Sequence, residues 1–150
     1  MNTDPLIFER TYKTSAARLW KALTNPNEMK RWYFNLPGFK AEVGYEFRFL
    51  GGKDEHTQYL HICKVTEAIP EKKLAHTWTY DGYTGSSLLT WELFEEGENI
   101  RLKLTHSGLH SFPKDVSDFA ASNFVAGWAA ILDQSLKGYL SSEVFTGNTP

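Results

Sequence analysis

Hydrophobic and polar positions alternate with a period of two through the middle of the chain, which is typical of antiparallel strands. Phe47 and Phe49 alternate with Glu46 and Arg48, so an aromatic face opposes a charged face. The same pattern predicts further strands over residues 58–67, 73–80, 87–95 and 100–106. Segments rich in glycine and polar residues separate the strands, beginning with a turn predicted over residues 51–54 (GGKD).

A short strand and two short helices are predicted ahead of these strands. Residues 6–12 form the strand, and Ser15 is the expected N-cap of a helix over residues 16–23. The Asn25-Pro26 pair ends this helix and begins a second one over residues 27–32, because asparagine suits the cap and proline the first turn.

The last third of the chain is predicted to form one long helix. At about 100° per residue, its apolar positions fall on one broad arc and polar residues such as Asn123 and Asp133 fall opposite. The arc contains Ala120, Phe124, Trp128, Ile131, Leu132 and Tyr139. It spans close to half of the circumference, which is wider than a helix on a flat sheet needs. We therefore expect an α+β domain in which a curved sheet wraps around this helix.

The composition is that of one globular domain, expected over residues 1–150 with an ordered core of about 6–140 and a loosely ordered tail after Leu140. Aromatic residues make up 15% of the chain, more than such a core needs, which indicates an aromatic-lined interior. A net charge of −2 gives no attraction to nucleic acid or to an anionic membrane.

The single cysteine, Cys63, excludes an internal disulfide and agrees with a reducing compartment. Residues 1–5 show no secretion signal, and no apolar run approaches the roughly 20 residues of a membrane span. We therefore expect a cytoplasmic protein without a membrane span, as a monomer or homodimer.

Four stretches of the chain carry a family resemblance. They are LWKALTNPNEMKRWY, KLAHTWTYDG, WELFEEGENIRLKLTHSGL and GWAAILDQSLKGYL, in order within residues 6–140. They resemble the opening segment, two strands and the Gly-Trp C-terminal helix of the activator of heat-shock-protein ATPase (Aha) homologue-like family, in the START-like (SRPBCC) superfamily. The resemblance implies a helix-grip fold, in which two short helices close one end of a curved antiparallel sheet around the long helix.

Several functions are open, because fold similarity does not choose among them. The superfamily is similar in architecture to lipid-transfer domains, plant allergen-like carriers, polyketide cyclases and heat-shock co-chaperones. We expect a hydrophobic or amphipathic small molecule, such as a lipid, to bind in a cavity between the sheet and the C-terminal helix. One alternative is a module that interacts with a heat-shock chaperone in a stress response. Another is a cyclase- or hydrolase-like enzyme that uses the same cavity.

The consecutive rings of Trp32, Tyr33 and Phe34 cannot all face one way on a helix or a strand. In a helix-grip fold the short helices cross the open end of the sheet, so this cluster is expected at the rim of the cavity. Trp32 then belongs to the lining and lid, or it plugs the end of the core. Tyr33 is expected to face solvent.

His106 is the candidate polar anchor for a ligand carbonyl or hydroxyl, because it ends a strand whose apolar residues face inward. The alternative is a core histidine satisfied by a main-chain carbonyl. His76 has the same two interpretations, since the pattern does not show which faces of strands 58–66 and 74–80 are inner. Gly127 is expected to allow close approach of a strand or of the lid segment, because glycine inside a helix costs about 1 kcal/mol relative to alanine.

No catalytic residue, cofactor or metal ligand is predicted. His106 and His110 lie four residues apart in a loop region, where that spacing implies no shared face. Ser107 lacks the strained Gly-x-Ser-x-Gly elbow of a nucleophile, and no glycine-rich phosphate loop follows a strand. Cys63 is expected to be a small packed hydrophobe.

The predicted ligand site draws its apolar surface from strand aromatics and the C-terminal helix, with His106 and Tyr80 supplying direction. Its residues are Trp32, Phe47, Phe49, Trp78, Tyr80, Trp91, His106, Phe124 and Trp128.

Overall fold

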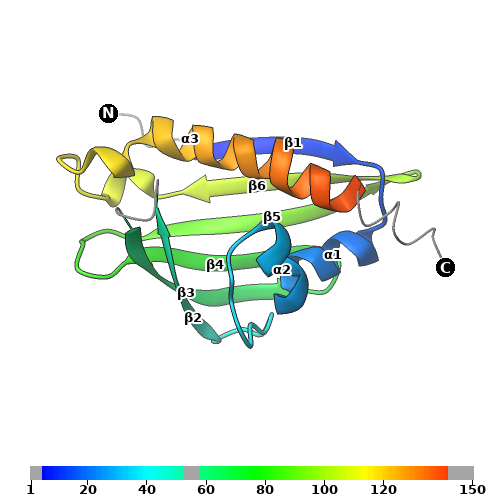
Figure 1. Ribbon diagram of the computed structural model, residues 1–150, viewed down its shortest axis with the longest axis horizontal. Helices are drawn as coiled ribbons and strands as arrows, with labels where there is room; N and C mark the ends of the chain where they lie inside the picture. The colour runs from blue at the N-terminus through cyan, green and yellow to red at the C-terminus, as the bar shows by residue number, and fades with distance from the viewer. Residues whose placement is uncertain (1–4, 53–57, 142–150) are drawn as a thin grey trace.

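The structure is a computed structural model that describes residues 5–52 and 58–141. Its six strands form one antiparallel sheet in the order β1-β6-β5-β4-β3-β2 (Figure 1). The strands are β1 Leu6–Tyr12, β2 Glu46–Gly52, β3 Gln58–Ile69, β4 Lys73–Tyr80, β5 Ser87–Glu96 and β6 Asn99–Ser107. The predicted α+β class and its helix-grip arrangement are confirmed.

The turn predicted over residues 51–54 is in part wrong, because residues 51 and 52 belong to β2. Residues 53 and 54 lie outside the described part of the chain. The predicted tail lies outside it from residue 142 onward.

The two short helices begin at the predicted caps. Helix α1, Ala16–Thr24, is capped by Ser15, whose Oγ accepts from the main-chain N–H of Arg18 at 3.1 Å. Helix α2, Pro26–Trp32, has Asn25 as its cap and proline in its first turn. A polar side chain at each N-cap satisfies main-chain donors that the helix itself cannot pair.

The C-terminal helix follows two short 3₁₀ turns, η1 Leu109–Ser111 and η2 Ser117–Phe119. It consists of α3, Ala121–Ala130, then a π-helical segment, η3 Ile131–Leu136, and continues as helix to residue 141. The predicted long C-terminal helix is confirmed, and the π segment within it was not anticipated. Tyr12 donates its hydroxyl hydrogen to the main-chain oxygen of Leu132 at 2.8 Å, so strand β1 supplies a hydrogen bond to this irregular segment.

The core is an aromatic seam between the sheet and the helices, centred on Trp91 of β5. The Trp91 ring is 2% exposed and meets Trp32 at 6.2 Å and Trp128 at 5.9 Å between ring centroids. Trp32 ends α2 and Trp128 lies on α3, so all of these elements pack on the same face of the sheet. Figure 1 shows α3 running along β6 and β1, with α2 nearer β3 and β4.

Strand β3 carries the irregularity that bends the sheet. Its register against β4 shifts between Val65 and Glu67, which leaves Thr66 as an extra residue. Such a bulge increases the local twist and bends the strand. A bent sheet is the surface expected opposite the wide apolar arc of the C-terminal helix.

Within the described residues, no helix is both long enough and apolar enough to cross a membrane.

Candidate functional site

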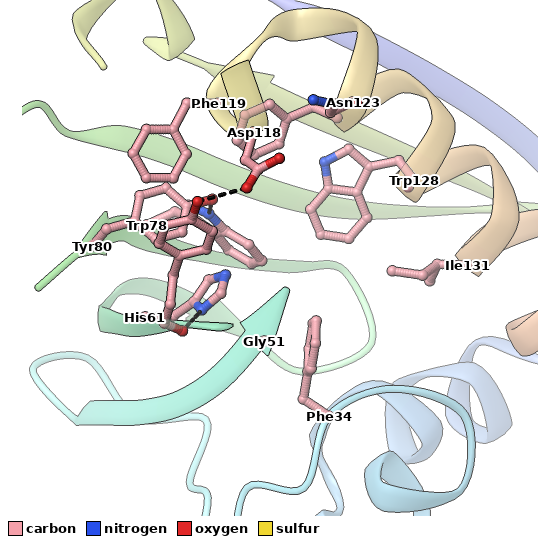
Figure 2. Close-up of a pocket in the computed structure, with 13 residues that line it drawn as sticks. Phe34, Gly51, His61, Trp78, Tyr80, Asp118, Phe119, Asn123, Trp128 and Ile131 are labelled. Carbon is pink, nitrogen blue, oxygen red and sulfur yellow. Dashed lines mark hydrogen bonds between the residues drawn. The ribbon is translucent and has the colours of Figure 1, made fainter. Parts of the chain in front are cut away.

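A cavity of about 360 Å³ lies between one end of the sheet and the C-terminal helix (Figure 2). The sheet contributes Gly51, Tyr59, His61, Trp78 and Tyr80. The helical side contributes Asp118, Phe119, Asn123, Phe124, Gly127, Trp128 and Ile131, and the loop after α2 contributes Phe34. Asn123 and Gly127 are exposed, so the cavity opens beside the first half of α3.

The structure brings Trp78, Tyr80, Phe124 and Trp128 of the predicted site together in this lining. Trp78 and Trp128 meet edge to face with centroids 5.5 Å apart. They form a wall where β4 faces α3, and rings in this arrangement present large apolar surface with little freedom to move.

Trp32, Phe47 and Trp91 of the predicted site lie elsewhere, around a void of about 10 Å³. That volume holds about one water molecule and no larger ligand. The indole N–H of Trp32 donates to the main-chain oxygen of Ala22 at 2.9 Å, and the side chain is 5% exposed. A buried and hydrogen-bonded indole is the geometry expected if Trp32 plugs the end of the core.

Phe49 lies one layer behind the cavity wall. Its ring stacks on His61 with centroids 4.4 Å apart and meets Phe34 at the same separation. Phe49 therefore supports two residues of the lining without being part of it.

The expectation that Tyr33 faces solvent is wrong. Its ring stacks on Trp32 at 5.0 Å and meets Trp91 at 5.9 Å. Its hydroxyl is buried without a hydrogen-bond partner among the described residues, and burial raises its pKa well above the usual value. The cause is the backbone at Tyr33, which ends α2 with φ −129° and ψ −135° and so turns successive rings inward.

His106 lies behind the cavity wall, with no exposed surface, and outside the lining. Its Nδ1 accepts from the indole N–H of Trp128 at 3.1 Å, and its Nε2 lies 2.8 Å from Ser87 Oγ. Ser87 in turn donates to the main-chain oxygen of Trp78 at 2.8 Å. Both ring nitrogens are thus used within the core, as expected of a core histidine, but their partners are two side chains and not the main-chain carbonyl that was expected.

His76 and His61 share one local pattern on neighbouring strands. The Nδ1 of each lies 2.9 Å from a main-chain carbonyl oxygen, that of Thr77 for His76 and that of Tyr59 for His61. Burial lowers the pKa of each ring to about 4. Only His61 of this pair belongs to the lining of the large cavity.

Further polar groups lie around His61. The Tyr59 hydroxyl donates to Asp118 Oδ2 at 2.6 Å, and this hydrogen bond raises the pKa of Tyr59 to about 12 (Figure 2). The indole N–H of Trp78 donates to the Tyr80 hydroxyl at 2.8 Å. The cavity therefore combines aromatic walls with several hydrogen-bonding groups at its sheet end, the usual composition of a small-molecule site.

The sequence reasoning missed Gly51, Tyr59 and His61 of the lining, whereas Phe34 belongs to the aromatic cluster that was expected at the rim. Gly51 offered a signal, because glycine in a strand pattern often marks a close approach of other groups. A Cβ atom there would lie 3.0 Å from Phe34 Cε1 and 3.1 Å from His61 Cε1. Ile131 lies on the predicted apolar arc of the C-terminal helix, whereas Asn123 was expected on the opposite, polar side and Asp118 gave no signal. The positions of Asp118 and Asn123 depend on how the C-terminal helix enters the fold.

The close approach expected at Gly127 is not found. A Cβ atom added there would meet nothing within 4 Å, and Gly127 lines the cavity instead. The missing side chain leaves space at the cavity wall.

Within residues 5–52 and 58–141, no group of three or more His, Cys, Asp or Glu side chains could hold a metal ion. The Cys63 thiol is buried, and burial raises its pKa. Its surroundings are those of a packed, unreactive thiol.

The chain matches the family described as "Activator of Hsp90 ATPase homolog 1-like protein" over residues 13–141 and belongs to that family. This confirms the resemblance and places the chain in the START-like superfamily. No curated protein matches the chain.

Solved structures show the same fold. CalU16 from Micromonospora echinospora is 23% identical, with 95% of this chain and 79% of CalU16 covered and a TM-score of 0.71. DynU16, from the dynemicin biosynthetic locus, is 20% identical, with 95% of this chain and 49% of DynU16 covered and a TM-score of 0.76. Mll3558 from Rhizobium loti is 21% identical, with 91% of this chain and 96% of Mll3558 covered and a TM-score of 0.77.

Proposed function

We propose that this protein binds a hydrophobic or amphipathic small molecule in the cavity between the sheet and the C-terminal helix. The observation that carries the proposal is the cavity of about 360 Å³ with walls of Trp78, Phe119, Phe124 and Trp128. This volume is at the lower end of the roughly 300–1,000 Å³ of small-molecule sites, and burial of apolar ligand surface supplies the driving force.

The comparisons agree with this proposal. The chain belongs to a START-like family, and DynU16, which shares its fold, comes from a biosynthetic locus. The chaperone hypothesis, in contrast, expects a small or filled cavity and a partner-binding outer surface. The cavity volume therefore favours the small molecule over the chaperone as the occupant of this site.

His61 and Tyr80 are better suited to binding than to proton transfer. Efficient proton transfer needs a group whose pKa lies near the working pH. Burial lowers the pKa of His61 to about 4 and raises that of Tyr80, so one is a weak base and the other a weak acid at pH 7. Both remain neutral hydrogen-bonding groups, which suits recognition of a bound molecule.

A fluorescence titration with pyrene tests the proposal on a leucine variant of Gly127. Gly127→Leu places a side chain in the space beside the cavity, where a Cβ meets no other atom within 4 Å. We expect its affinity for pyrene to fall at least about tenfold, equivalent to about 1.4 kcal/mol. Gly138→Leu is the matched control, because Gly138 lies on the same helix with open space around it and outside the lining.

Two results would contradict the proposal. One is a wild-type protein that does not bind pyrene, and the other is equal affinity in the Gly127→Leu and Gly138→Leu variants. Native mass spectrometry of protein purified without detergent is the complementary measurement. It detects a small molecule that remains bound through purification, and the Gly127→Leu variant should lose that mass.

A further inference from the structure

His61 presents a hydrogen-bond acceptor at the cavity wall. Its Nδ1 lies 2.9 Å from the main-chain oxygen of Tyr59, and a carbonyl oxygen can only accept, so Nδ1 carries the hydrogen. The ring is neutral at pH 7, because burial lowers its pKa to about 4. Nε2 therefore holds a lone pair, and no donor within the described residues is bonded to it.

Tyr80 presents a hydrogen-bond donor beside it. The indole N–H of Trp78 can only donate, so the Tyr80 oxygen accepts that hydrogen at 2.8 Å. The hydroxyl keeps its own hydrogen at neutral pH, because burial raises the pKa of Tyr80. That hydrogen has no acceptor in the part of the chain that the structure describes.

The two groups lie together by virtue of the sheet register. His61 of β3 is directly opposite Tyr80 of β4, and their ring centroids are 4.7 Å apart. Both side chains line the cavity and are nearly buried, with 5% of His61 and 7% of Tyr80 exposed (Figure 2). A free acceptor and a free donor thus lie side by side at the sheet end of the cavity.

We infer that His61 and Tyr80 bind the hydroxyl group of an uncharged, ring-bearing ligand. Tyr80 donates to the ligand oxygen, and His61 Nε2 accepts the ligand hydroxyl hydrogen. The inference rests on the proposed function and names its ligand class, a phenol or a ring-bearing alcohol. The ring system of the ligand lies against Trp78 and Trp128, which supply flat apolar surface.

Other polar groups fit this pair less well. A ketone or ether oxygen accepts from Tyr80 but leaves His61 Nε2 desolvated and without a donor. A carboxylate places negative charge against the Nε2 lone pair in a buried site, where an uncompensated charge is strongly disfavoured. A hydroxyl group satisfies both partners at once, since it donates one hydrogen and accepts another.

Titrations with 1-hydroxypyrene, 1-methoxypyrene and pyrene test the inference, because the three share one ring system. We expect the wild-type protein to bind 1-hydroxypyrene roughly 3- to 10-fold more tightly than pyrene, the range that one or two modest hydrogen bonds give. The methoxy compound has the oxygen but no hydrogen to donate. It should therefore lose much of that preference.

Variants of His61 and Tyr80 test whether these two residues cause the preference for 1-hydroxypyrene over pyrene. His61→Phe and Tyr80→Phe should each bring the ratio of hydroxypyrene to pyrene affinity close to one while pyrene itself still binds. His76→Phe is the matched control, because His76 is a buried histidine with the same main-chain hydrogen bond outside the lining. Its ratio should equal that of the wild-type protein.

The outcomes separate this inference from the proposed function. Equal wild-type affinity for 1-hydroxypyrene and pyrene would overturn the inference and leave the proposed function standing. A preference that survives both His61→Phe and Tyr80→Phe would also overturn it. Absence of binding for every pyrene would overturn the proposed function itself. If a variant fails to fold, the inference is tested by the ratio of 1-hydroxypyrene affinity to pyrene affinity in the wild-type protein.

Discussion

Trp128 donates its indole hydrogen to His106 Nδ1 across 3.1 Å, which ties the C-terminal helix to strand β6 through the core. The bond sets the tautomer of the ring, because an accepting Nδ1 leaves the hydrogen on Nε2 for Ser87. His106, which the sequence offered as either a ligand anchor or a core histidine, thereby has both ring nitrogens bonded within the core. Trp128 itself still lines the cavity with its ring.

His106→Phe is therefore expected to reduce stability without changing ligand selectivity. The substitution keeps most of the ring volume but leaves the indole hydrogen of Trp128 buried and unpaired. An unpaired buried donor costs about 1–3 kcal/mol of unfolding free energy. Urea denaturation measures this loss, and the titrations with 1-hydroxypyrene and pyrene should keep the wild-type affinity ratio. A ratio that falls to one while stability is unchanged would restore His106 as the anchor.

Trp32 and Phe34, two residues apart, are expected to respond in opposite ways to substitution by alanine. Trp32 is 5% exposed and lies outside the large cavity, so Trp32→Ala should cost about 3–5 kcal/mol in stability. Phe34 is half-buried and lines the cavity, so Phe34→Ala should cost less stability and weaken pyrene binding more. Urea denaturation and pyrene titration of both variants make the comparison.

If Trp32 instead forms part of a lid at the cavity rim, the opposite result is expected for Trp32→Ala. Pyrene affinity should then change more than stability. That result would contradict the plug geometry, in which the Trp32 indole is hydrogen-bonded to Ala22.

Glycine-to-alanine changes in the C-terminal helix should raise stability. A Cβ at Gly127 or Gly138 meets nothing within 4 Å, so neither site has a packing reason for glycine. Each Gly→Ala change should add about 0.5–1 kcal/mol to the free energy of unfolding, because glycine loses more chain entropy on folding. Urea denaturation measures the gain. A loss of stability in Gly127→Ala would contradict the open space beside this position.

The elements of the fold could be predicted because their causes are local. Alternation places Trp78 and Tyr80 on one face of β4, and Ser15 and Asn25 cap helices through main-chain donors a few residues away. These causes act between near neighbours in the chain, so the sequence displays them.

The cavity could be predicted only in part because its shape depends on distant contacts. The inner face of β3, which carries His61, follows from pairing with β4 and from the bulge near Val65. The turn of the chain at Tyr33 brings Phe34 against Gly51, two residues that no local pattern connects. The pattern left His106 as either an anchor or a core histidine because it shows only that the strand faces inward, and the hydrogen bond that decides between them comes from a residue of the C-terminal helix.

Stability should fall steeply in mild acid because His61, His76 and His106 are buried as neutral rings. Burial lowers their pKa values from 6.5 to about 4, about 4 and about 3, and the value for His106 includes a smaller contribution from neighbouring His76. These three rings bind protons below about pH 6.5 in the unfolded chain but not in the folded chain, so their contribution to stability is complete above that pH and is lost as the pH falls toward 4.

Each histidine contributes up to about 1.4 kcal/mol per pH unit in this window, so the free energy of unfolding should drop on the order of 5 kcal/mol between pH 7.5 and 5.0. Urea denaturation across that range measures the slope. His76→Phe removes one titrating ring outside the large cavity and should make the slope shallower by about one third, even if its stability at pH 7.5 also changes. An identical slope in wild type and His76→Phe would mean that protonation of this buried ring does not drive the acid transition.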